Sequence, residues 1–225
     1  MTEAVLVLGV ERSDMAAASR TAPTTVLLVR HGLTPTTGKL LPGRSAGLHL
    51  SDVGQRQAEA AARRIGKLER VAAIYSSPLE RARETALSIA KVRGLALRIE
   101  RGLLELDIGE WTGSSLARVS RKPEWQQVQR YPSGFRFPGG ESFTEMQARI
   151  TGTLAALVAR HRGGTIVAVS HADPIKAALA HALGMHLDHF QRLVIAPASI
   201  TTIAYGATGP VVIGVNVPAE GTRPA

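Results

Sequence analysis

The chain has 225 residues, of which 44% are hydrophobic and 4% aromatic, which suffices for one substantial core built mainly of aliphatic side chains. It contains no cysteine, which excludes disulfides, thiolate metal sites and cysteine nucleophiles, and favours a cytoplasmic location. The formal net charge of +9 comes mostly from scattered arginines without interleaved aromatic residues, so the sequence predicts an anionic small-molecule substrate rather than a nucleic acid.

The N-terminal residues 1–22 are expected to form a poorly ordered extension. Their apolar stretch at residues 4–10 is flanked by charged residues and is too short to span a bilayer, and no later segment reaches transmembrane length. An added strand over residues 4–10 is the alternative. We expect one domain over residues 23–217, followed by a flexible tail at residues 218–225.

Strands and helices are expected to alternate along the domain. The predicted strands are short β-branched and aliphatic runs at residues 25–29, 71–75, 95–100, 165–170, 199–205 and 211–216. The predicted helices run from Ser51 or Asp52 to about Leu68, from Pro78 to Gly94, near 114–130, from Ser142 to about His161, and from Asp173 toward Gly184. This order predicts a three-layer αβα sandwich with a mostly parallel central sheet.

A segment rich in glycine, proline and basic residues interrupts this alternation. It follows the third predicted strand, and its composition is typical of an excursion or lid rather than of a sheet element. We therefore expect a lid-like insertion at about residues 106–141.

Two predicted strands each end in a histidine. The first ends at Arg30-His31-Gly32 and another at His171, while the helix after a third strand begins with Arg81. If these strands are neighbours, the four side chains converge at the carboxyl edge of one sheet, where open α/β sheets bind ligands. Imidazole can attack phosphorus while arginines neutralise the phosphoryl oxygens. Glu105 is the best-placed carboxyl to protonate a leaving alkoxide.

Five motifs, in order, resemble those of the histidine phosphatase superfamily, which includes the cofactor-dependent phosphoglycerate mutases. The resemblance extends over about residues 24–205. The motifs are Arg30-His31-Gly32, Ser76 to Thr85, Leu104-Glu105 with Gly109 to Gly113, Gly139 to Ser142, and Val169-Ser170-His171.

The resemblance implies a phosphohistidine mechanism without a cofactor or a metal. In that mechanism His31 is the nucleophile, Arg30, Arg81 and His171 hold the phosphate, and Glu105 is the acid and later the base that activates water. The cluster His181, His186, Asp188 and His189 does not share one helix face, so we expect no metal site there.

Three further residues are implied on the substrate side. Gly43 stands where such enzymes often offer a backbone amide to the substrate. Thr37 replaces an asparagine that is common after the nucleophile, and Ala172 replaces a glycine that often follows the second histidine. This sequence therefore departs from its relatives at the substrate rather than at the reacting phosphate.

The short interval from Glu105 to Glu141 favours a phosphatase, because the mutases that resemble this chain carry a longer insertion there that shields the phosphoenzyme from water. A cofactor-dependent phosphoglycerate mutase is one alternative. A catalytically silent phosphate-ligand or protein-binding module is the alternative from another class. The natural substrate is left open between several phosphate esters, and the oligomeric state is also open, with a homodimer among the options. We expect no membrane partner.

Overall fold

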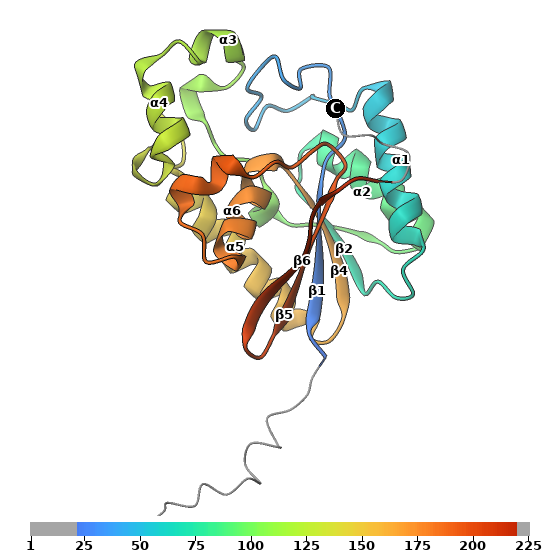
Figure 1. Ribbon diagram of the computed structural model, residues 1–225. Coiled ribbons are helices and arrows are strands. Elements are labelled where there is room, and N and C mark those ends of the chain that lie inside the picture. The colour runs from blue at the N-terminus through green and yellow to red at the C-terminus, as the bar shows by residue number, and fades with distance from the viewer. Residues whose placement is uncertain (1–21, 220–225) are drawn as a thin grey trace, which may run out of the picture.

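The computed structural model describes residues 22–219 and consists of a central sheet with helices on both faces (Figure 1). The extension predicted over residues 1–22, with its alternative strand at residues 4–10, lies outside the described residues except for residue 22. Of the tail predicted over residues 218–225, the structure describes the first two residues, and Ala219 is buried.

The sheet has six strands in the order β3-β2-β4-β1-β5-β6. Pairings among the first four strands of this order are parallel, whereas β5 runs antiparallel to β1 and β6 runs antiparallel to β5. The strands are β1 (Thr24–Arg30), β2 (Ala73–Ser76), β3 (Leu97–Ile99), β4 (Thr165–Ser170), β5 (Ile200–Gly206) and β6 (Gly209–Val217). The predicted α/β fold with a mostly parallel sheet is confirmed.

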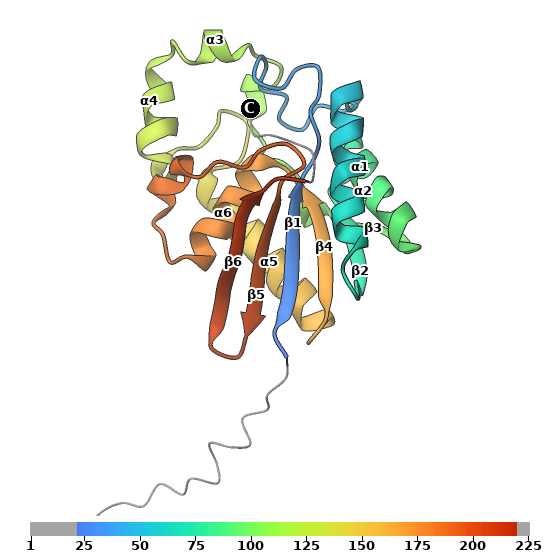
Figure 2. The same ribbon diagram turned by 45° about the vertical axis from the view of Figure 1, so that its right-hand side comes forward.

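Four long helices cover the two faces of the sheet. They are α1 (Asp52–Gly66), α2 (Glu80–Arg93), α5 (Phe143–Arg160) and α6 (Ala172–Ala182). Figure 2 shows α1 and α2 on one side of the sheet and α5 and α6 on the other. In β1, Leu27 and Val29 join the apolar cluster beneath α1 and α2, while Val26 and Leu28 join the cluster beneath α5 and α6. Because both faces are covered, the strand is apolar at every central position.

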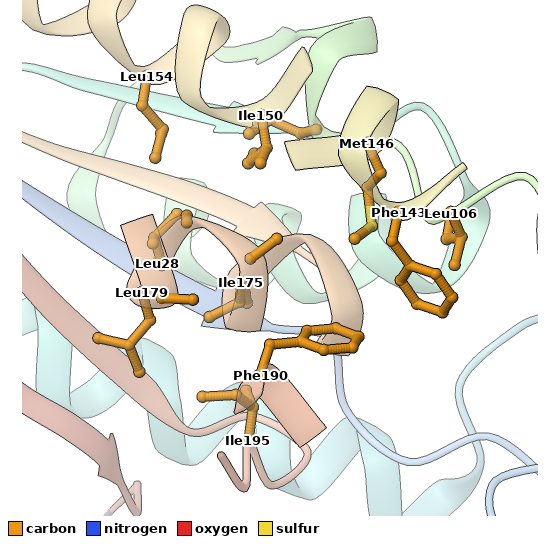
Figure 3. Packing of buried hydrophobic residues seen from close by; sticks show 14 of the residues in the cluster. Leu28, Leu106, Phe143, Met146, Ile150, Leu154, Ile175, Leu179, Phe190 and Ile195 are labelled. Atoms are coloured by element: carbon orange, nitrogen blue, oxygen red, sulfur yellow. The ribbon is translucent and has the colours of Figure 1, made fainter. Parts of the chain in front are cut away.

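The larger core lies between the sheet and the helices α5 and α6. Figure 3 shows Met146 and Ile150 of α5 directed toward Ile175 of α6, with all three side chains fully buried. The rings of Phe143 and Phe190 meet edge to face, with centroids 5.2 Å apart. Burial of this set fixes the position of α6, and with it the loop that carries His171.

The boundaries of the long helices follow capping chemistry. Ser51 accepts a hydrogen bond from the backbone of Gly54 and begins α1, and Ser142 forms a capping box with Glu145 at the start of α5. Gly94 adopts the left-handed conformation that ends α2.

Two of the predicted helix ends were wrong. α2 begins at Glu80, so Pro78 precedes the helix instead of occupying its first turn. α1 ends at Gly66, and Leu68 lies beyond it with 37% of its surface exposed.

The segment between β3 and α5 contains two short helices, α3 (Leu116–Val119) and α4 (Pro123–Arg130). A single helix near 114–130 was predicted, and this prediction was wrong. Pro123 lacks the backbone N–H that a continuous helix requires, and it begins a new helix instead. Trp111 is buried here and packs against Trp125 with ring centroids 6.5 Å apart, and it belongs to the same apolar cluster as the core beneath α5 and α6.

Among the helices of residues 22–219, none combines the length and the apolar character that crossing a membrane requires.

Candidate active site

Parallel pairing brings the two histidines together. Arg30 at the end of β1 is in register with Ser170 at the end of β4, so His31 and His171 leave neighbouring strands at the same level. The backbone N–H of His31 donates to the carbonyl of Ser170 at 3.0 Å, and the two imidazole rings meet edge to face with centroids 5.1 Å apart. Both side chains are buried.

The ring of His31 is held in the tautomer that a nucleophile requires. Its Nδ1 lies 2.7 Å from the carbonyl oxygen of Gly32, which can only accept, so Nδ1 carries the proton and Nε2 keeps its lone pair. Burial and the nearby charges of Arg30 and Arg81 lower the pKa of His31 well below its ordinary value. The imidazole is therefore neutral at neutral pH and can attack an electrophile.

Close packing around Gly32 fixes the backbone next to His31. A Cβ atom at Gly32 would lie 2.4 Å from the carbonyl oxygen of Gly54 in α1, so only glycine fits this contact. The backbone N–H of Gly32 also donates to Thr85 Oγ1 in α2 at 3.1 Å. The nucleophile's backbone is thus held by two helices as well as by the sheet.

The ring of His171 is oriented by Ser77, which follows β2. The two atoms His171 Nε2 and Ser77 Oγ are 2.8 Å apart. The N–H of Leu79 donates to the same hydroxyl oxygen at 3.4 Å, and we assign the hydroxyl proton to the bond with Nε2 and the ring proton to Nδ1. Within residues 22–219, Nδ1 of His171 has no hydrogen-bond partner, so it is free to donate to an anion.

Arg81 supplies a buried cation at the start of α2. Its side chain is fully buried, and Nη2 donates to the carbonyl oxygen of Gly43 at 2.8 Å. Among the described residues, neither its Nε nor its Nη1 finds a partner, and the same is true of Nε in Arg30. Buried guanidinium donors without partners are costly unless an anion completes the site. These groups match the oxygens of a phosphoryl group.

Glu105 is the carboxyl of the site. Its Oε1 accepts a hydrogen bond from the backbone of Leu106 at 2.9 Å. Burial, followed by the repulsion of Asp173, raises the pKa of Glu105 to about 7, against the opposing influence of Arg81 and Arg30. A carboxyl with this pKa can both donate and accept a proton near neutral pH.

The three residues predicted on the substrate side have different surroundings. Gly43 contacts Arg81 through its carbonyl oxygen. Ala172 is the first residue of α6, directly after His171. The hydroxyl of Thr37 bonds within its own turn, to the N–H and the hydroxyl of Thr34 at 3.0 and 2.9 Å, and none of its hydrogen bonds reaches the histidine pair.

Several residues of the site were missed in the sequence. Asp173 acts on Glu105 through its charge, and Ser77 orients His171. Arg44 and Arg149 both donate to the backbone carbonyl of Glu105, at 2.9 and 3.3 Å. Asp173 and Ser77 adjoin recognised motifs, which was a usable signal. The two arginines lie in a loop and in the middle of a helix, and their spacing in the sequence gave no such signal.

No group of three or more histidine, aspartate or glutamate side chains within residues 22–219 is arranged to hold a metal ion.

The fold and the site define a class of proteins in which two strand-end histidines, buried arginines and a carboxyl surround a place for a phosphoryl group. The chain belongs to the histidine phosphatase superfamily (branch 1), whose family model matches residues 26–218. This membership confirms the resemblance drawn from the five motifs.

Similar proteins include enzymes with different substrates. Phosphoserine phosphatase 1 of Hydrogenobacter thermophilus is 34% identical over 180 residues, which cover 78% of this chain and 85% of that enzyme. The structure of a mycobacterial glucosyl-3-phosphoglycerate phosphatase matches 87% of this chain and 99% of its own, with a TM-score of 0.79 and 28% identity.

A bifunctional protein of Mycobacterium tuberculosis is 33% identical over 192 residues, which cover 85% of this chain and 53% of that protein. The chain thus spans about half the length of this relative.

Proposed function

We propose that this chain is a phosphomonoesterase that acts through a phosphohistidine intermediate on a small anionic metabolite. The observation that carries the proposal is the pairing of His31 with His171 beside the unpartnered donors of Arg81. A neutral imidazole with a free Nε2 is a nucleophile, and the buried cations offer the electrostatic stabilisation that phosphoryl transfer requires.

The reaction has two steps that balance on the residues of the site. In the first, His31 Nε2 attacks phosphorus, the bond to the ester oxygen breaks, and the protonated carboxyl of Glu105 gives its proton to the leaving oxygen. In the second, the Glu105 carboxylate takes a proton from water, whose oxygen attacks phosphorus while the bond from phosphorus to nitrogen breaks. His31 is regenerated and inorganic phosphate leaves.

The role of the arginines makes a metal ion unnecessary in this scheme. Arg30, Arg81 and His171 offer donors to the phosphoryl oxygens, which is the role that a metal ion has in many other phosphoryl-transfer sites. Hydrolysis rather than transfer to a second substrate is supported by the two relatives named as phosphatases and by the short interval between Glu105 and Glu141. A cytoplasmic location remains part of the proposal.

The proposal is tested by hydrolysis of p-nitrophenyl phosphate and by trapping of the phosphoenzyme. We expect the wild-type protein to turn over this ester in excess chelator and to form an acid-labile phosphoryl adduct. His31→Ala should abolish both signals. His189→Ala is a suitable control because its exposed ring packs against His186 and takes part in none of the hydrogen bonds of the site.

Three outcomes would reject parts of the proposal. Normal turnover by His31→Ala would reject the nucleophile, and loss of all activity in chelator would reject the metal-free mechanism. Phosphate binding without any adduct would identify a binding module instead of an enzyme. A panel of phosphate esters, with phosphoglycerate assayed both with and without a bisphosphoglycerate primer, would then distinguish phosphatase from mutase.

A further inference from the structure

Arg44 lies between the two parts of the candidate site. The residue before it, Gly43, accepts a hydrogen bond from Arg81 Nη2 at 2.8 Å. The side chain of Arg44 donates through Nε to the backbone carbonyl of Glu105 at 2.9 Å. The dipeptide Gly43-Arg44 therefore contacts both the Arg81 side chain and the backbone of Glu105.

The guanidinium of Arg44 is held by two carboxylates. Its Nη1 lies 3.2 Å from Asp107 Oδ2, and its Nη2 lies 2.8 Å from Glu141 Oε2. Asp107 lies two residues after Glu105, and its backbone N–H donates to Glu141 Oε2 at 3.1 Å, so both carboxylates are attached to the turn that contains Glu105. About a quarter of the Arg44 side chain is exposed, 28%, so the ion pairs are partly shielded from water.

Arg149 of α5 holds the same carboxylate. Its Nε and Nη2 donate to the two oxygens of Glu141 at 2.8 and 2.9 Å, which is the paired geometry that favours arginine over lysine. Its Nη1 donates to the carbonyls of Gly102 and Leu104 at 2.9 Å each. The turn before Glu105 is therefore fixed to α5.

We propose that Arg44, supported by Glu141 and Arg149, is a positioning residue that sets the place of the Glu105 carboxyl relative to the phosphoryl group bound at Arg81. This inference rests on the proposed function. Arg44 donates to the backbone carbonyl of Glu105, and the side-chain carboxyl is tied to the same stretch of backbone because its Oε1 accepts a hydrogen bond from the N–H of Leu106.

The chemistry predicts a selective defect when this positioning is lost. Proton transfer to the leaving group matters most for esters of poor leaving groups, and a displacement of about 1 Å can cost about a hundredfold in rate. A nitrophenolate leaves without a proton, so phosphoryl transfer from this ester to His31, the step that kcat/KM reports, depends on His31, His171 and Arg81 and not on the proton of Glu105. Loss of Arg44 should therefore lower kcat/KM for esters of poor leaving groups and leave kcat/KM for p-nitrophenyl phosphate nearly unchanged.

The experiment compares Arg44→Met with the wild-type protein on p-nitrophenyl phosphate and on an alkyl phosphate, phosphoserine. We expect kcat/KM for phosphoserine to fall about tenfold to a hundredfold, and kcat/KM for p-nitrophenyl phosphate to change by less than about threefold. Arg44→Lys should restore part of the loss, because one ammonium can reach one carboxylate or the carbonyl but not all three acceptors.

A second variant guards against misfolding, and a third provides a control. Glu141→Gln keeps the shape of the carboxylate and should show the same selectivity if Arg44→Met does not fold. Arg136→Met removes an exposed ion pair with Glu145 and should leave both substrates unaffected.

The outcomes distinguish this inference from the proposed function. Equal losses on both substrates, or no loss on phosphoserine, would overturn the positioning role of Arg44 while leaving the phosphatase proposal intact. If phosphoserine is not hydrolysed by the wild-type protein, glycerol phosphate replaces it as the alkyl ester. A wild-type protein that hydrolyses no ester at all would overturn the proposed function, and the positioning role with it.

Discussion

Replacement of Glu105 by glutamine should make the protein more stable at alkaline pH. The folded state raises the pKa of this carboxyl from 4.5 to about 7, mainly through burial. A carboxyl with a raised folded-state pKa contributes no penalty below pH 4.5. The penalty grows as the pH rises from 4.5 and levels off above about 7, because in this interval the carboxyl is ionised in the unfolded chain but protonated in the folded protein. Glutamine resembles the protonated carboxyl and carries no such penalty.

The magnitude follows from this change in pKa. The rise of the pKa from 4.5 to about 7 corresponds to a loss of about 3 kcal/mol of unfolding free energy above pH 8. Glu105 is only partly buried by surface area, so screening by water reduces the expected gain to about 2 kcal/mol. The difference between Glu105→Gln and the wild-type protein should be absent near pH 4.5 and complete by pH 8.

The assay is equilibrium urea unfolding of both proteins from pH 4.5 to pH 8.5 in buffer without phosphate. A stability difference that does not change with pH would refute the reasoning. Glu145→Gln gives a control of opposite sign, because the hydrogen bond from Arg136 and that from the Ser142 backbone lower the pKa of Glu145 to about 2. That variant should be less stable than the wild-type protein throughout this pH range, and the difference should shrink only below pH 4.5, as the pH falls toward 2.

Two further predictions concern Arg81 and a turn of the insertion. Arg81→Met should raise the unfolding free energy of the ligand-free protein by about 1 kcal/mol, because it removes two unpartnered buried donors for one lost hydrogen bond to Gly43. The same variant should abolish stabilisation by phosphate. Lower stability than the wild-type protein in thermal unfolding without phosphate would contradict this. In urea unfolding, Gly109→Ala should lower the unfolding free energy by at least about 2 kcal/mol more than Gly113→Ala does. Both glycines have positive φ, but a Cβ at Gly109 would lie 2.0 Å from the carbonyl oxygen of Pro138. Equal losses of stability would refute the steric argument.

Local sequence determined most of the elements. The alternation of short aliphatic strands with capped helices predicted the α/β sandwich, and Ser51, Gly94 and Ser142 lie at the predicted helix ends. These signals are local, since a cap or a left-handed glycine acts within one turn of backbone. The single helix near 114–130 was wrong because Pro123 can begin a helix as readily as it can interrupt one.

In the candidate site, too, some features follow from local sequence and others only from the packing of distant segments. The residues that follow the strands, His31 and His171, could be read from the chain alone, and the motifs around them identified Arg81 and Glu105. That β1 and β4 are neighbours in register depends on the folded chain, and this register places the centroids of the two imidazole rings 5.1 Å apart.

Tertiary structure also decided how the acid is held. Arg44 is far in the chain from Glu141 and Arg149, and it meets them only where the loop after β1 reaches the end of the insertion and α5. Such contacts depend on long-range packing, which no spacing along the chain records. The raised pKa of Glu105 has the same cause, because only folding buries this carboxyl and brings Asp173 close to it.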